Sequence, residues 1–199
     1  MEYIFTLLNF INIYIDQNYF FSLLLYFSFL LLFFSFSLPG GTVIILASGF
    51  FFDFAIGFII NISTITIGSM IFIFFSQTIM KKLFKKSFDK YSSKFSSIIK
   101  NSSYEYLILF RLIIGPPLLA QNLCLSFIDI SKTKIFLSTM IGFTPLMFLF
   151  SYTGSYLANL TDLKNVSISN IFSEEFLFII ILLIIIIIIR IRMKKINNK

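Results

Sequence analysis

Residues 110–122 read FRLIIGPPLLAQN, a stretch that places an arginine, a glycine, two prolines and two amides inside an otherwise apolar chain. Placing an arginine at the centre of a bilayer costs about 2.5–3.5 kcal/mol on insertion scales. Pro116 and Pro117 cannot donate backbone hydrogen bonds, and Pro116 disfavours the helical conformation at Gly115. The stretch therefore predicts a helix break close to Arg111, where the backbone faces protein or a wet cavity.

The composition predicts an integral membrane protein. Of the 199 residues, 58% are apolar, 29 are phenylalanine, and the mean hydropathy is +0.95, which a water-soluble domain could not bury. Histidine is absent and Cys124 is the single cysteine, so neither a metal site nor a cofactor is expected. No nucleophile–base set, Walker loop or GxGxxG motif is visible, and the chain is not expected to be an enzyme.

The basic residues of this chain, which has a formal charge of +7, flank its apolar runs. Seven lysines lie between residues 81 and 100, Lys132 and Lys134 precede another apolar run, and five basic residues lie between 190 and 199. A basic chain invites a nucleic-acid interpretation. Flanking positions of this kind instead indicate membrane orientation, and no nucleic-acid partner is expected.

Hydropathy and breaks along the chain predict an all-α membrane protein with about four transmembrane helices and two re-entrant helical hairpins. The predicted units are an N-terminal interfacial helix (1–19), a membrane domain (20–160), and a final transmembrane helix with a basic cytoplasmic tail (161–199). Within the domain we expect spans at 20–37, 58–80 and 135–157, hairpins at 38–57 and 104–125, and a cytoplasmic amphipathic segment at 81–103.

The charge distribution supports two hairpins that enter from opposite faces. If both hairpins return to their own side, 14 of the 16 basic residues lie on one face, and both termini are cytoplasmic. Treating either hairpin as a full span divides the basic clusters between the two faces. The alternative for residues 104–125 is a kinked spanning helix from which Arg111 snorkels to the interface.

Three stretches carry a resemblance to a known family: LPGGTVIILASGFFFDFAIGF (38–58), FRLIIGPPLLAQN (110–122) and FLSTMIGFTPLMFLFSYTGSYL (136–157). In this order they resemble the DedA superfamily, the VTT-domain or SNARE-associated membrane proteins. The closer branch is similar to the yeast vacuolar TVP-type proteins and their bacterial relatives. The resemblance covers roughly residues 38–157.

The resemblance implies which residues bind substrate. In the family an R-x-x-P-x-x-P-type element lies in the second hairpin, and Arg111, Pro117 and Asn122 occupy its places, although Ile114 replaces the first proline. Asp53 is the one acidic candidate in the first hairpin and does not reproduce the acidic motif of the proton-coupled branch, so an outer-interface position is an equal alternative. The candidate substrate-binding residues are Arg111, Gly115, Pro116, Pro117, Asn122, Pro39, Gly40, Gly49 and Asp53.

The implied function is lipid transport, with scramblase- or flippase-like movement of phospholipid or polyprenyl phosphate between leaflets. Partners would be anionic membrane lipids, with a homo-oligomer left open, and the expected location is the bacterial cell (inner) membrane. The alternative is a non-transport scaffold or assembly factor that acts through its basic surface helix. A cation transporter is not favoured, because intramembrane carboxylates are few.

Overall fold

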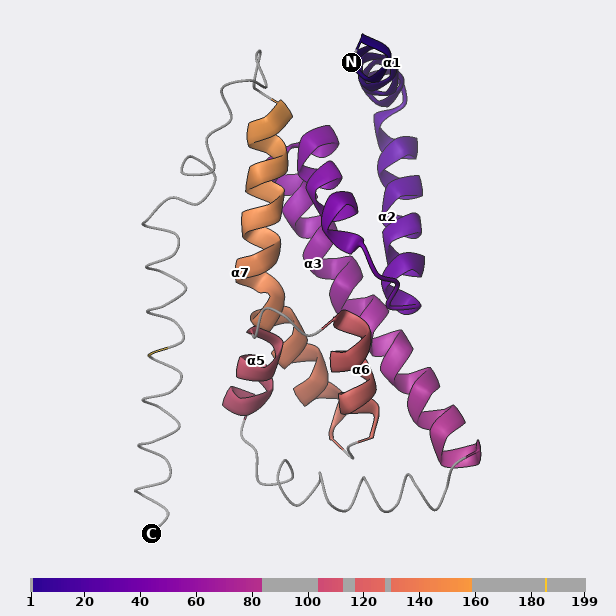
Figure 1. Cartoon of the computed structure of the whole chain (residues 1–199), viewed down its shortest axis with the longest axis vertical. Helices are drawn as coiled ribbons and strands as arrows, with labels where there is room; N and C mark the ends of the chain where they lie inside the picture. The colour runs from indigo at the N-terminus through magenta and orange to yellow at the C-terminus, as the bar shows by residue number, and fades with distance from the viewer. Residues whose placement is uncertain (1, 84–103, 113–116, 128–129, 159–184, 186–199) are drawn as a thin grey trace.

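The computed structural model is predominantly helical in the part of the chain that it describes, namely residues 2–83, 104–112, 117–127, 130–158 and 185. Its helices run in several directions through one bundle (Figure 1). Their bounds are α1 Glu2–Gln17, α2 Tyr19–Ser35, α3 Gly41–Leu83, α5 Tyr104–Leu112, α6 Leu118–Ser126 and α7 Lys132–Ala158.

Two helices, α1 and α2, form a bent pair at the N-terminus. The axes of residues 10–17 and 19–35 differ by 110°, and Figure 1 shows α1 lying across one end of the bundle. The bounds of α2 agree closely with the predicted span at 20–37. The crosswise direction of α1 is that of an interfacial helix, although its position at a membrane surface stays a prediction.

A sharp reversal divides α3 into two antiparallel arms. Phe52 (φ −122°, ψ 16°) and Asp53 (φ 63°, ψ 167°) depart from helical geometry. Asn61 Nδ2 donates to the carbonyl oxygen of Ile45 at 3.0 Å, whereas residues sixteen apart in one straight helix would be separated by about 24 Å. We call residues 41–51 the first arm and residues 54–83 the second arm.

The chain also reverses between α2 and the first arm, at residues 36–40. Tyr26 on α2 donates its hydroxyl to the carbonyl oxygen of Ile44, and the ring of Tyr19, at the start of α2, lies 6.0 Å from that of Phe52 at the end of the first arm, so α2 and the first arm run antiparallel. Ser37 adopts a left-handed conformation with φ 49°. Ser37 is buried and meets the side chain of Asn122, whereas Leu38, Pro39 and Gly40 of the LPGG segment are exposed.

Helices α5 and α6 run in opposite directions (Figure 1), and we call them the α5–α6 pair, although α5 packs mainly on α7 and α6 on α3. Lys134, in the first turn of α7, lies over the ring of Tyr104 at the start of α5, with Nζ 5.7 Å from the ring centroid. Lys132 lies over Phe74, near the end of the second arm, at 5.0 Å. We call this end of the bundle, where Lys82 also lies, the basic end. The α5–α6 pair begins and finishes there.

Glycines allow α7 to pack directly on the backbone of the first arm. A Cβ placed on Gly154 would lie 2.0 Å from the carbonyl oxygen of Leu46, and one on Gly49 would lie 2.1 Å from that of Ser151. A Cβ on Gly57 would also lie 2.7 Å from the amide nitrogen of Gly49. Small residues therefore bring three helical segments into close contact, as in other membrane bundles.

Two helices of the described residues are long and apolar enough to cross a membrane, Gly41–Ile79 and Lys132–Ala158, and a third is added if the bent pair counts as one span. This confirms the prediction of an all-helical membrane protein. The number of four spans, the re-entrant placement of the hairpins and the division into three units stay predictions. The predicted final span and nearly all of the basic segment at 81–103 lie outside the described residues.

Candidate functional site

Arg111 lies in the last turn of α5 and is 2% exposed. It is the largest of the fully buried side chains in the described part of the protein. Its backbone packs against Gly142 of α7, where a Cβ would lie only 2.4 Å from the Cβ of Arg111. The sequence therefore brings α5 close to α7 by removing a side chain at position 142, and this contact buries the arginine.

The guanidinium group of Arg111 has few protein partners. Its Nη1 donates to Gln121 Oε1 on α6 at 3.4 Å, which is long for a hydrogen bond. Its Cζ lies 5.3 Å from the centroid of the Phe143 ring, within cation–π range. Within the described residues, Nε and Nη2 have no hydrogen-bond partner. A buried charged donor without a partner costs more than about 1–3 kcal/mol, so this group is well suited to receive an anion.

The N-terminus of α6 lies next to this guanidinium, because Gln121 belongs to the first turn of α6. Pro117 is the N-cap residue, and no side chain forms a cap hydrogen bond there. Helix N-termini carry partial positive charge and free backbone N–H groups, which favour anions. Pro117 is exposed, while Gly115 and Pro116 lie outside the described residues.

Asn122 connects the second hairpin to the turn of the first. Its Nδ2 donates to Ser37 Oγ at 2.8 Å and to Ser69 Oγ at 3.3 Å. Asn122 is fully buried, and its Oδ1 has no partner within the described residues. The amide thus joins α6, the turn at 36–40 and the second arm at one point of the interior. Pro39 and Gly40 belong to the same turn and are exposed.

The two other candidates from the sequence, Gly49 and Asp53, lie apart from this cluster. Gly49 is buried against Ser151 and Gly57, which assigns it a packing role. Asp53 is exposed at the reversal inside α3. Their roles in binding stay predictions, but the structure groups Arg111 and Asn122 with the LPGG turn and with neither of these residues.

Sequence reasoning missed a second buried polar cluster around Asn61. Its Nδ2 lies 2.6 Å from Ser48 Oγ and 2.9 Å from Ser151 Oγ, in addition to its bond with Ile45. The available signal was an amide side chain in the middle of an otherwise apolar predicted span, which is costly unless it is paired inside the bundle. The contact of Phe143 with Arg111 gave no signal, because phenylalanine is abundant throughout the chain.

Residues 38–156 match the family description of the VTT domain. The chain belongs to the VTT domain family. The matched region begins in the LPGG turn and ends near the end of α7, so it contains Arg111, Asn122, the reversal inside α3 and most of the turn at residues 36–40. Neither the curated proteins nor the solved structures give a match.

Membership of the VTT domain family confirms the resemblance to DedA and SNARE-associated proteins at the family level. VTT domain proteins are membrane-associated and are commonly regarded as related to lipid transport. A membrane location agrees with the apolar helices α3 and α7. The similarity to the TVP-type branch stays a prediction.

Proposed function

We propose that this VTT domain protein moves anionic lipids between the two leaflets, with the lipid phosphate bound at Arg111. The observation that carries the proposal is a buried guanidinium with two unpartnered nitrogens. Guanidinium binds phosphate through two parallel hydrogen bonds, and such charge-assisted bonds are about twice as strong as neutral ones. Phospholipid and polyprenyl phosphate both present this group.

The N-terminus of α6 would add to the binding of the phosphate. Transporters commonly place the N-termini of broken helices against anionic substrates near the middle of the membrane. Here Gln121, which contacts Arg111, lies in the first turn of α6. A phosphate that takes the place of the long Gln121 contact would satisfy Arg111 and face the uncapped helix end.

The same proposal gives a role to the turn at residues 36–40 and to the α5–α6 pair. The turn at residues 36–40 meets α6 through the Ser37–Asn122 bond, and the α5–α6 pair enters from the basic end. If both are re-entrant, the polar groups at their tips shorten the apolar barrier for a headgroup, while acyl chains stay in the surrounding lipid. The proposal has passive scrambling or flipping as its reaction and no covalent chemistry.

Charge supports one orientation in the membrane. Lys82, Lys132 and Lys134 all lie at the basic end of the bundle, and basic residues concentrate on the cytoplasmic side. We propose that the basic end is cytoplasmic and that the protein resides in the bacterial inner membrane. Helix α1 lies at the other end of the bundle (Figure 1), so this orientation would place the N-terminus on the outer face, unlike the expectation from the sequence that both termini are cytoplasmic.

Reconstituted transport tests the function. Purified protein in liposomes carrying a fluorescent phospholipid should move the label between leaflets, as measured by dithionite bleaching. Arg111→Gln should slow this movement about tenfold or more, because one charge-assisted hydrogen bond is worth about 1.5–3 kcal/mol. Arg111→Lys should give an intermediate rate, since it keeps the charge and loses the paired geometry.

The control for charge removal is Lys134→Gln, which removes a cation at the basic end and should leave the rate unchanged. Thermal unfolding in detergent shows whether each variant is folded. A folded Arg111→Gln variant with the wild-type rate for every lipid would overturn the proposal.

The scaffold alternative predicts the opposite result. Replacing Lys81, Lys82, Lys85 and Lys86 would abolish function in cells, while Arg111→Gln would have no effect. Lys82 is exposed at the end of α3, and most of the basic segment lies outside the described residues, so this alternative rests on the sequence.

A further inference from the structure

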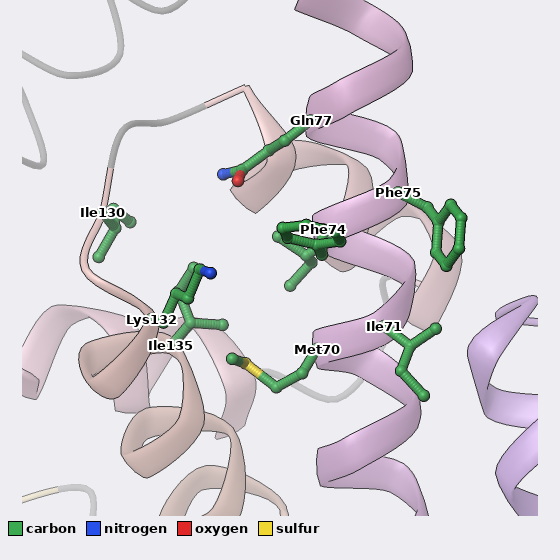
Figure 2. Close-up of a pocket in the computed structure, with 9 residues that line it drawn as sticks. Met70, Ile71, Phe74, Phe75, Gln77, Ile130, Lys132 and Ile135 are labelled. Atoms are coloured by element: carbon green, nitrogen blue, oxygen red, sulfur yellow. The ribbon is translucent and has the colours of Figure 1, made fainter.

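A pocket of about 280 Å³ lies at the basic end, between the second arm and the start of α7. Met70, Ile73 and Phe74 line it from α3, and Ile130, Lys132 and Ile135 line it from the opposite side (Figure 2). Of the nine lining residues, Lys132 is the charged one and Gln77 is the one other polar side chain. The pocket is therefore an apolar slot with a cation beside it.

Two of the residues that line this pocket are held in place by packing against other helices. Ile73 and Ile135 are each 2% exposed, and both belong to a buried cluster with Leu107 of α5 and Leu125 of α6. Their contacts with other helices fix the positions of these two walls. The slot is thus built by the packing of four helices, and an apolar chain would find a formed surface there.

Lys132 stands at the edge of the slot. Its side chain is exposed, and Nζ lies 5.0 Å from the centroid of the Phe74 ring. Figure 2 shows Lys132 and Gln77 extending from opposite sides toward the space beside Phe74. The cation therefore lies where the headgroup of a molecule would be if the tail of that molecule occupied the apolar slot.

The size and position of the pocket select the ligand. A volume of 280 Å³ is slightly below the roughly 300–1,000 Å³ of small-molecule sites, so it holds a section of one chain rather than a whole lipid. Lys82 and Lys134 lie at the same end, and basic residues at a membrane surface attract anionic lipids. The complementary ligand has an apolar chain attached to an anionic headgroup.

We propose that this pocket binds one anionic phospholipid, with part of an acyl chain against Ile73, Phe74 and Ile135 and the phosphate at Lys132. The site is separate from Arg111, and binding there does not require transport. It would hold an anionic lipid at the basic end of the bundle whether or not lipid moves between leaflets.

The absence of tryptophan from the chain allows a direct test with the whole protein in vesicles. Phe74→Trp places a single fluorophore in the pocket, and Ile59→Trp places one on an exposed position of the second arm outside it. Each variant is reconstituted in phosphatidylcholine with increasing amounts of either brominated phosphatidylglycerol or brominated phosphatidylcholine. Quenching of the tryptophan reports the lipid in contact with it.

The pocket tryptophan should show about a fivefold preference for the anionic lipid, the factor contributed by one basic residue at an anionic surface. The tryptophan at position 59 should show no preference. Adding Lys132→Gln to Phe74→Trp should abolish the preference, whereas adding Lys134→Gln should preserve it.

A second reporter, Ile130→Trp, guards against a Phe74→Trp side chain that fills the pocket itself. Equal quenching by both lipids at both reporters would overturn the proposal. So would a preference that survives Lys132→Gln. A wild-type transport rate in the Lys132→Gln variant, together with a lost preference, would support a separate site and would leave the proposal for Arg111 unaffected.

Discussion

Gly142 of α7 and Arg111 of α5 are in contact so close that a Cβ at position 142 would lie 2.4 Å from the Cβ of Arg111. The arginine is buried because its neighbour has no side chain. This contact makes Gly142 a positioning residue for the guanidinium. A substitution at Gly142 should move the charge of Arg111, whereas a substitution of Arg111 itself removes it.

Gly142→Ala should push α5 away from α7 and lower stability by about 1–3 kcal/mol through overpacking. Lipid transport should fall along with stability, because Arg111 is displaced while its charge is retained. Thermal unfolding in detergent and the liposome assay measure the two effects. Ile141→Val, at the exposed neighbouring position, is the control and should change neither. An unaffected Gly142→Ala variant would contradict the close contact.

The hydrogen bond between Asn122 and Ser37 should appear as an energetic coupling between the two hairpins. In a double-mutant cycle with Asn122→Ala and Ser37→Ala, we expect a coupling of about 0.5–2 kcal/mol, the range for polar contacts between membrane helices. Ser28, which bonds to its own helix at Leu24, provides the control cycle with Asn122 and should be additive. Additivity in both cycles would show that the two segments do not depend on this bond.

Gly49 should behave as a packing residue. Gly49→Ala places a methyl group 2.1 Å from a backbone oxygen of α7, which cannot move aside as a flexible side chain would. We expect a loss of about 1–3 kcal/mol in stability, with Ala55→Ser, at an exposed position of the second arm, as a neutral control. Unchanged stability combined with weaker lipid binding would instead make Gly49 part of the binding site.

We expect the Asp53→Gly variant to be more stable than the Asp53→Ala variant. Its φ of 63° and ψ of 167° lie in a region that is occupied almost exclusively by glycine and costs other residues about 1–3 kcal/mol. Asp53→Gly should therefore unfold at a higher temperature than Asp53→Ala. The reverse order would show that the backbone at the reversal differs from the one described.

The helical class and the helix break within residues 110–122 could be predicted from the sequence. An arginine and two prolines are energetically unfavourable in a continuous apolar helix. The bounds of α2 were also close to expectation, whereas the sequence did not locate the reversal at Asp53 within the predicted hairpin. The helix break at the LPGG turn was expected, but its contact with α6 through Ser37 and Asn122 was not predicted. Hydropathy indicates that a helix ends at such a turn and contains no information about the distant helix that the turn contacts.

The candidate site was predictable in part for a related reason. Arg111 and Asn122 are polar side chains in an apolar stretch and can be recognised from the sequence alone. Their partners are Gly142, Phe143, Ser37 and Ser69, ordinary residues in a phenylalanine- and serine-rich chain. These partners come from distant segments, with Ser37 and Asn122 separated by 85 positions in the sequence, so the tertiary fold alone identifies them.

The separation between Ser37 and Asn122 also has a consequence for biogenesis. A ribosome adds about 5–20 residues each second, so their separation of 85 positions corresponds to a delay of roughly 4–17 s. During that interval the Ser37 hydroxyl has emerged and its amide partner has not been synthesised. The contact between the turn at residues 36–40 and α6 can therefore form only after α2 and α3 have been synthesised.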